Sequence, residues 1–96
     1  MKLFIIDDST VNNIFLQSIL EEYGYIVHSA ISGEEALRKI ETFGPDVILL
    51  DLMMPGMSGI DLLKKFREME LDIPVVIISA YREYEYHKKA KELGAK

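Results

Sequence analysis

The sequence predicts an α/β protein whose core is a doubly wound parallel sheet, and two observations lead to that fold class. Short apolar runs alternate four times with segments of helical periodicity, and joints rich in Gly, Pro, Asp and Ser separate them. Such short joints imply right-handed crossovers, which make neighbouring strands parallel and place helices on both faces of the sheet. The run at residues 47–50 is apolar without interruption and begins with β-branched side chains, which is typical of a central strand covered on both faces.

The first strand is predicted at Lys2–Ile6, and the helix after it carries a broad apolar arc. A helix that is apolar over so wide an arc is expected to contact more than the sheet, and Gly24 supplies its C-terminal stop. Residues 25–30 are expected to form an edge strand. The apolar arc consists of Val11, Ile14, Phe15, Leu16, Ile19, Leu20 and Tyr23, with Ser18 among them.

Two serines are predicted to cap the next helices. Ser32 is followed three residues later by Glu35, so we expect the serine oxygen to accept the N–H of Glu35 and the glutamate to return to the cap. Ser58 and Asp61 have the same spacing. The final helix should end at Gly94. After the edge strand, the expected elements are a helix at 33–42, a strand at 47–50, a helix at 59–69, a strand at 75–78 and a helix at 82–93.

The composition favours one domain over residues 1–96 and limits its partners. Its 16 acidic against 11 basic residues give a formal charge of -5, which argues against direct contact with nucleic acid and suits a site that attracts a cation. The chain has no cysteine, so disulfides and thiolate metal sites are excluded. Neither a signal peptide nor an apolar span of about 20 residues is present, and a cytoplasmic protein without membrane contact is therefore expected.

Polar side chains follow three of the predicted strands. Asp7 and Asp8 end the first strand, Asp51 ends the central strand before Met-Met-Pro-Gly, and Ser79 ends the fourth. Because the carboxyl ends of parallel strands meet at one edge of a sheet, where ligands bind, we expect these groups in one pocket. Carboxylates so close repel one another, so the cluster calls for a hard cation such as Mg²⁺ or Mn²⁺. The alternative for Asp51 alone is a solvated residue at the end of a strand.

Other candidate ligands have a structural alternative. Asn12, one turn past the acid pair, is either a solvated helix residue or polar support for the metal site. His28 has no second histidine, cysteine or acid nearby at ligand spacing, so a surface position is expected. Met53, Met54 and Met57 are expected to fill gaps in the packing, because soft thioethers do not match hard carboxylates at a metal.

Together these motifs resemble the receiver domain of two-component response regulators, in particular chemotaxis-regulator-like receivers. The resemblance covers residues 2–95 and implies a flavodoxin-like fold with strand order 2-1-3-4 and a site above the first, third and fourth strands. It further implies a phosphoacceptor, not a turnover enzyme, that takes its phosphoryl group from a histidine kinase or a phosphotransfer domain. The matching motifs are the acid pair, D-x-x-M-P-x-x-x-G at residues 51–59, Ser79-Ala80, Gly94-Ala95 and A-I-S-G-E-E-A-L at residues 30–37.

The resemblance also implies roles for residues in the expected pocket. Asp51 would be the nucleophile that becomes an aspartyl phosphate. Asp8, Asp51 and the backbone carbonyl of Met53 would bind Mg²⁺, with Asp7 as a partner on the water side. Ser79 would donate its hydroxyl to a phosphoryl oxygen. The supporting residues would be Ala80, which keeps the entrance open, Asn12 and Pro55.

The sequence departs from the family pattern after Gly94-Ala95. Receivers continue through a fifth strand with an aromatic switch residue, a lysine that pairs with the phosphoryl group and a fifth helix, whereas this sequence stops at Lys96. A C-terminally truncated receiver is therefore expected, with residues 75–78 as an unprotected edge and the first helix partly uncovered. Self-association through the fourth strand and first helix would cover both. The alternative function is accordingly an interaction or structural fragment without a phosphorylation switch. A flavin-binding domain is disfavoured, because the acids would repel its phosphate.

Overall fold

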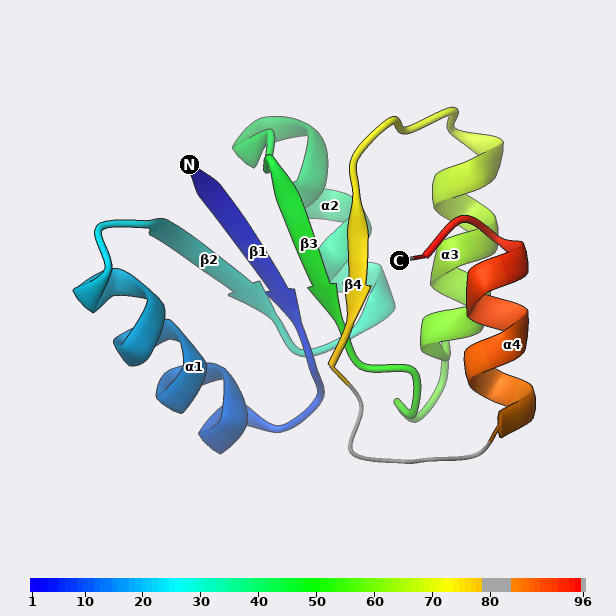
Figure 1. Ribbon diagram of the computed structural model, residues 1–96, viewed down its shortest axis with the longest axis horizontal. Helices are drawn as coiled ribbons and strands as arrows, with labels where there is room; N and C mark the ends of the chain where they lie inside the picture. Colours follow the sequence, from blue (N-terminus) through cyan, green and yellow to red (C-terminus); the bar gives the residue numbers. More distant parts are fainter. Residues whose placement is uncertain (79–83, 96) are drawn as a thin grey trace.

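The sheet is parallel throughout and its strands follow the predicted order, β2-β1-β3-β4 (Figure 1). This computed structural model describes residues 1–78 and 84–95. The prediction is confirmed for the bounds of β1 and β3, whereas β2 begins one residue later and β4 ends one residue earlier than expected. Within the described residues the strands are β1 (Lys2–Ile6), β2 (Ile26–Ala30), β3 (Val47–Leu50) and β4 (Val75–Ile77).

Helices cover both faces of the sheet, as a doubly wound fold requires (Figure 1). The first helix packs on the face formed by Leu3 and Ile5 of β1. The second and third helices pack on the opposite face, where Phe4 and Ile6 are fully buried, and the fourth lies against the third. Strand β1 thus serves two cores, because successive side chains of a strand point to opposite faces. The helices are α1 (Thr10–Glu22), α2 (Gly33–Phe43), α3 (Gly59–Glu68) and α4 (Tyr84–Glu92).

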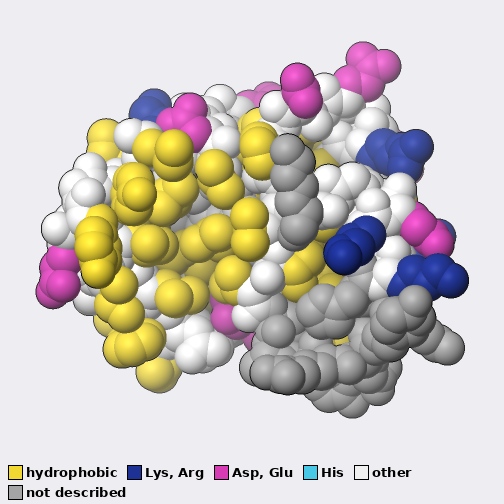
Figure 2. Space-filling view, viewed as in Figure 1, with side chains coloured by type: hydrophobic (Ala, Val, Ile, Leu, Met, Phe, Trp, Pro, Cys, Tyr) yellow, Lys and Arg dark blue, Asp and Glu magenta, His cyan; other side chains and the backbone are white. Residues whose placement is uncertain are grey.

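Part of the apolar arc of α1 is turned away from the sheet. Val11, Ile14 and Phe15 are 76%, 62% and 62% exposed. The side of the helix that faces the sheet presents Leu16 and Leu20, and the main contacts of α1 are with β1 and β2. No other part of the described chain covers these three side chains, so α1 is partly uncovered, as expected for a truncated receiver, and the further contacts expected of its broad apolar arc are not seen. Figure 2 shows apolar side chains gathered over α1 and the adjacent face of the sheet.

The two predicted caps differ in detail. Ser58 and Asp61 form the expected capping box, in which the Asp61 N–H donates to Ser58 Oγ (3.2 Å) and the Ser58 N–H donates to Asp61 Oδ2 (3.4 Å). Ser32 Oγ accepts the N–H of Glu35 at 3.1 Å, also as expected. The carboxylate of Glu35, however, accepts the N–H of Ile31 (2.9 Å) instead of the N–H of the cap residue. The prediction that this glutamate returns to the cap is therefore wrong by one residue.

The last helix ends as predicted. Gly94 has a φ of 101°, and the Ala95 N–H donates to the carbonyl of Ala90 at 3.0 Å, which is the hydrogen bond of a Schellman end. Residues 82 and 83, which were expected in this helix, lie outside the described residues. In the part of the chain that the structure describes, no helix is long and apolar enough to cross a bilayer.

Candidate functional site

The ladder hydrogen bonds of the sheet extend past the strands and hold the first acids in place. The Asp7 N–H donates to the carbonyl of Ala30 at 3.1 Å, which continues the pairing of β1 with β2. The Asp51 N–H donates to the carbonyl of Ile6 at 2.8 Å, which continues the pairing of β3 with β1. Both backbones are therefore fixed by the sheet at its carboxyl edge, as the sequence predicts.

Asp7, Asp8 and Asp51 meet at this edge and are called the acid cluster below. One carboxylate oxygen from each lies within 4.8 Å of the others. Asp7 is only 5% exposed, Asp51 is half-buried and Asp8 is exposed. The predicted meeting of three carboxylates is confirmed. Asp7 was expected on the water side of the site, and in the structure it is the most buried of the three.

The side chain of Asp7 is oriented by donors from the start of α1. The Ser9 N–H donates to Asp7 Oδ1 at 2.9 Å, and Asn12 Nδ2 donates to Asp7 Oδ2 at 3.4 Å. The second contact is long for a hydrogen bond, and Asn12 is exposed. Asn12 thus combines the two alternatives, a solvated helix residue and polar support for the metal site, since it is exposed and still touches the acid cluster.

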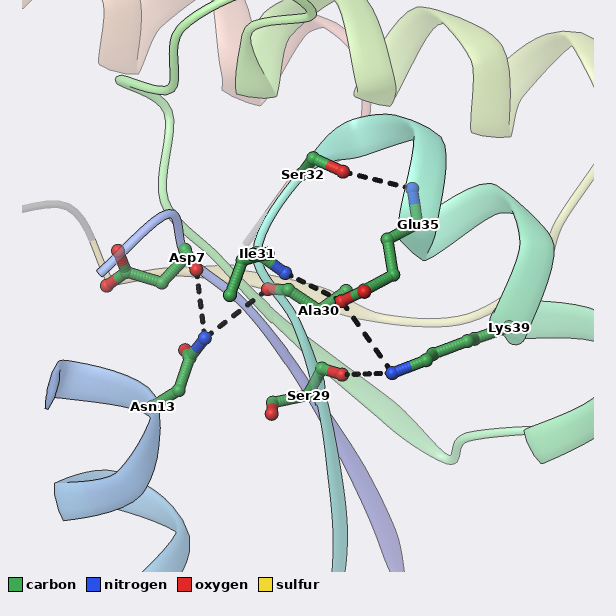
Figure 3. Close-up of polar contacts among 8 residues, drawn as sticks. All are labelled: Asp7, Asn13, Ser29, Ala30, Ile31, Ser32, Glu35 and Lys39. Atoms are coloured by element: carbon green, nitrogen blue, oxygen red, sulfur yellow. Dashed lines mark hydrogen bonds and ion pairs between the residues drawn. The ribbon is translucent and has the colours of Figure 1, made fainter. Parts of the chain in front are cut away.

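Asn13 is the residue that sequence reasoning missed at this site. It is 3% exposed, and its Nδ2 donates to the carbonyls of Asp7 (2.9 Å) and Ala30 (3.4 Å), so one amide ties α1 to the ends of β1 and β2 (Figure 3). Its Oδ1 is buried and has no hydrogen-bond partner. The spacing of Asn13 with Leu16 and Leu20 could have revealed it, because residues three and seven positions apart lie on one helix face.

The loop after β3 contacts the side chain of Asp51 and the backbone around it. The Met53 N–H donates to Asp51 Oδ1 at 3.1 Å, and the Gly59 N–H donates to the carbonyl of Leu52 at 3.0 Å. A Cβ placed on Gly59 would lie 2.5 Å from both the Asp51 carbonyl oxygen and the Leu52 Cα. This close approach gives a physical reason for the glycine that ends the motif at residues 51–59.

The methionines of this loop mostly serve packing, as predicted. Met54 is buried, and Met57 packs against the core beside Gly33. Met53 is 39% exposed. Pro55 is exposed and lines a hollow of about 400 Å³ together with other residues of this loop. The role of the Met53 carbonyl as a metal ligand stays a prediction.

Three further residues named in the sequence analysis are Ser79, Ala80 and His28. Ser79 and Ala80 fall outside the described residues, so their expected roles stay predictions. His28 is exposed, and its ring stacks on Phe43 with centroids 3.9 Å apart. The predicted surface position of His28 is confirmed.

The acid cluster fits a small hard cation by the chemistry of its donors. All three side chains offer carboxylate oxygens, which Mg²⁺ and Mn²⁺ prefer to nitrogen or sulfur. Opposite ligands of an octahedral Mg²⁺ lie about 4.2 Å apart, since each Mg–O bond is about 2.1 Å. The carboxylate oxygens lie within 4.8 Å of one another, not far beyond this value, so small rotations of the side chains would bring them onto one ion.

Residues 3–96 match the family of response regulator receiver domains. Sporulation initiation phosphotransferase F of Bacillus subtilis is 37% identical over 94 residues, which cover 98% of this chain and 76% of that protein. The alkaline phosphatase synthesis transcriptional regulatory protein PhoP of Bacillus subtilis is 41% identical over 95 residues, which cover 98% of this chain and 39% of that protein. The chain therefore spans about three quarters of the first relative and under half of the second.

Solved structures of similar fold agree with this match. The chemotaxis protein CheY4 of Vibrio cholerae has a TM-score of 0.91 and 30% identity, and the superposition covers 99% of this chain and 81% of that one. The receiver domain of the Francisella response regulator 1452 has a TM-score of 0.90 and 36% identity, with 99% and 78% of the two chains covered.

Proposed function

The chain belongs to the family of response regulator receiver domains, and we propose that it accepts a phosphoryl group on Asp51 with Mg²⁺ bound at the acid cluster. The observation that carries the proposal is the meeting of three carboxylates within 4.8 Å at the carboxyl edge of the sheet. Receiver domains are signalling modules, bind Mg²⁺ at acidic residues and interact with histidine kinases or phosphotransfer proteins. For this chain we propose such a kinase or phosphotransfer domain as the donor, and no turnover activity of its own.

The proposed chemistry assigns the nucleophile to Asp51, which is held at the end of the central strand. A carboxylate oxygen of Asp51 attacks phosphorus, so that a P–O bond forms while the P–N bond of a phosphohistidine breaks and its electron pair stays on the imidazole nitrogen. Asp7 and Asp8 bind the cation together with Asp51, and the Met53 carbonyl is proposed as a further ligand. Mg²⁺, when bound, neutralises charge on the phosphoryl oxygens. Ser79 is proposed to donate a hydrogen bond to one of those oxygens.

The phosphoacceptor assignment is tested by mass measurement after incubation with acetyl phosphate and Mg²⁺. We expect the parent protein to gain the mass of one phosphoryl group and Asp51→Asn to gain none. The matched control is Asp72→Asn, which removes the same charge from an exposed acid outside the acid cluster and should be phosphorylated like the parent. Phosphorylation of Asp51→Asn to the same yield as the parent would show that another residue is the acceptor.

A second candidate function, favoured by the exposed apolar side of α1, is that of an interaction or structural fragment. Val11, Ile14 and Phe15 are all more than half exposed, and burial of apolar surface is the main favourable contribution to most protein associations. A chain with this function would associate with a second copy through α1 and β4, and its association would be the same with and without a phosphoryl group on Asp51.

The proposal includes the extent and location of the unit. One sheet spans residues 2–77 and α4 packs against α3, which supports a single domain over residues 1–96. We place this domain in the cytoplasm and assign it no direct contact with nucleic acid or membrane, in keeping with its charge of -5.

A further inference from the structure

A cavity lies beside α2 at the end of the sheet opposite the acid cluster. Its volume is about 570 Å³, which falls in the usual range for small-molecule sites. It touches Lys2 at the start of β1, whereas Asp7 and Asp8 follow the end of that strand. Asp7 follows Lys2 by five positions, a rise of about 17 Å, and none of the three acids lines the cavity, so the cavity is distinct from the acid cluster. The residues that matter below are Lys2, Ile26, His28, Arg38, Lys39 and Phe43.

The lining of this cavity is largely apolar, and its charged residues are all cations although the chain is acidic. Lys2, Arg38 and Lys39 contribute to it, and no Asp or Glu does, in a chain of formal charge -5. Among the described residues Arg38 has no hydrogen bond or ion pair. Lys2 Nζ donates to the Phe43 carbonyl at 3.2 Å. Lys39 Nζ donates to the Ser29 carbonyl at 3.1 Å and forms an ion pair with Glu35 Oε1 at 3.6 Å, which offsets part of its charge and leaves Arg38 as the main unpaired cation of the cavity. Each ammonium group has three N–H donors, so both lysines keep donors for an anion.

An exposed ring lies in the same cavity. The imidazole of His28 stacks on Phe43 with centroids 3.9 Å apart and an interplanar angle of 13°. Phe43 is buried and covers one face of the imidazole, while His28 is exposed and lines the cavity. The other face of the His28 ring therefore suits a second planar ring, and Ile26 adds an apolar side chain to the same cavity.

The geometry of β2 argues against an extended peptide in this cavity. The Ile26 N–H donates to the Met1 carbonyl, and the Ala30 carbonyl accepts from the Asp7 N–H, both at 3.1 Å. The backbone N–H and C=O groups of the even-numbered residues of β2 therefore point toward β1. The carbonyls of Val27 and Ser29 therefore point to the free edge, because hydrogen-bonding groups alternate along a strand. Both already accept side-chain donors, from Gln17 Nε2 at 3.2 Å and from Lys39 Nζ at 3.1 Å. A strand added at this edge would have to displace both.

We infer that this cavity binds a small ligand in which a planar aromatic ring is joined to phosphate, the chemistry of a nucleotide. The ring stacks on His28, and the phosphate lies among the cationic groups of Arg38, Lys39 and Lys2. Arginine is the strongest recognition element of the three, because its planar guanidinium can donate two parallel hydrogen bonds to phosphate. The inference does not depend on phosphorylation of Asp51.

The inference is tested by titrating ADP into the ¹⁵N-labelled full chain in EDTA, so that no metal bridges the nucleotide to the acid cluster. We expect the amide signals of His28, Phe43 and Arg38 to shift, and ADP to bind more tightly than adenosine or inorganic phosphate alone. His28→Ala and Arg38→Gln should each weaken ADP binding roughly tenfold. Lys64→Gln is the matched control, because it removes one charge from an exposed residue of α3 outside the cavity.

Four results would overturn the inference. The first is that millimolar ADP shifts no amide signal at the cavity. The second and third are that adenosine or phosphate alone, or a hexaglutamate peptide, binds as tightly as ADP. The fourth is that Lys64→Gln weakens ADP binding as much as Arg38→Gln does. The dispersion of the amide spectrum confirms folding of each variant. Should His28→Ala fail to fold, Arg38→Gln still decides the question, since Arg38 is exposed.

Discussion

A single buried amide, that of Asn13, connects the acid cluster to two strands. Its Nδ2 donates to the Asp7 carbonyl at 2.9 Å, and a carbonyl left without a donor in a buried place costs free energy. We therefore expect Asn13→Ala to lower the free energy of unfolding by about 1–2 kcal/mol and to weaken Mg²⁺ binding. The neighbouring Asn12→Ala is the control. It removes only a long contact from an exposed residue and should change stability by less than about 0.5 kcal/mol. Urea denaturation with and without Mg²⁺ compares the two variants, and equal effects would contradict a special role for Asn13.

Gly59 and Gly33 form a matched pair for a test of steric fit, since each is buried and begins a helix. A Cβ on Gly59 would meet backbone atoms of Asp51 and Leu52 at 2.5 Å, whereas a Cβ on Gly33 would meet the Sδ of Met57 at 2.6 Å. Backbone cannot move aside, but a methionine side chain can. We expect Gly59→Ala to destabilise the fold by about 1–3 kcal/mol and Gly33→Ala to cost less. Thermal unfolding measures both, and a loss from Gly33→Ala as large as that from Gly59→Ala would contradict this account.

At the scale of elements, the two sides of α1 should respond differently to substitution. Ile14→Ser and Phe15→Ser change exposed side chains and should leave the free energy of unfolding within about 0.5 kcal/mol of the parent. Leu16→Ala and Leu20→Ala remove contacts with the sheet and should each cost about 1–2 kcal/mol.

The same variants test self-association when sedimentation is measured at several concentrations. If α1 takes part in an interface between copies, the double variant Ile14→Ser/Phe15→Ser should have a lower mean molecular mass than the parent at high protein concentration. A parent protein that stays monomeric at every concentration would argue against self-association through this helix.

The orientation of α1 shows where sequence reasoning reaches its limit. Leu16 and Leu20 are as apolar as Ile14 and Phe15, so hydrophobicity alone does not reveal which side meets the sheet. The side of α1 that meets the sheet is the side that carries Asn13, whose hydrogen bonds hold it against the ends of β1 and β2. The meeting of the acids was predictable for a simpler reason, since it follows from where the apolar runs end, whereas the strand order was predicted from the resemblance to receiver domains.

Local polar geometry was harder to predict than the fold. Glu35 has the spacing of a capping box, yet its carboxylate accepts from Ile31 at 2.9 Å and lies 3.6 Å from Lys39 Nζ. Sequence spacing shows which groups are near one another, but the rotamer decides which donor is reached. Ser79, by contrast, lies outside the described residues, so the hydroxyl of the predicted pocket stays a prediction.

At the scale of the whole molecule, metal binding should stabilise the fold. A cation that binds only the native state adds RT ln(1 + [L]/Kd), about 1.4 kcal/mol at a tenfold excess of ligand over Kd. We expect millimolar Mg²⁺ to raise the Tm of the parent, because it relieves the repulsion within the acid cluster, and Asp8→Ala to remove most of that gain. Asp72→Ala is the control and should keep it. A parent Tm that is indifferent to millimolar Mg²⁺ would rule out the acid cluster as a metal site.

The side-chain donors on the outer carbonyls of β2 bear on the symmetry of any assembly. Gln17 and Lys39 occupy two of the carbonyls through which another strand would pair, so in the described sheet β4 is the edge with fewer obstacles to pairing. Two copies joined through β4 would bury these edges against each other about a two-fold axis, and each would present to the outside a β2 edge whose outer carbonyls already accept side-chain donors. Such an assembly is closed at two chains, whereas a sheet with two open edges can add copies without limit and grow into a fibre.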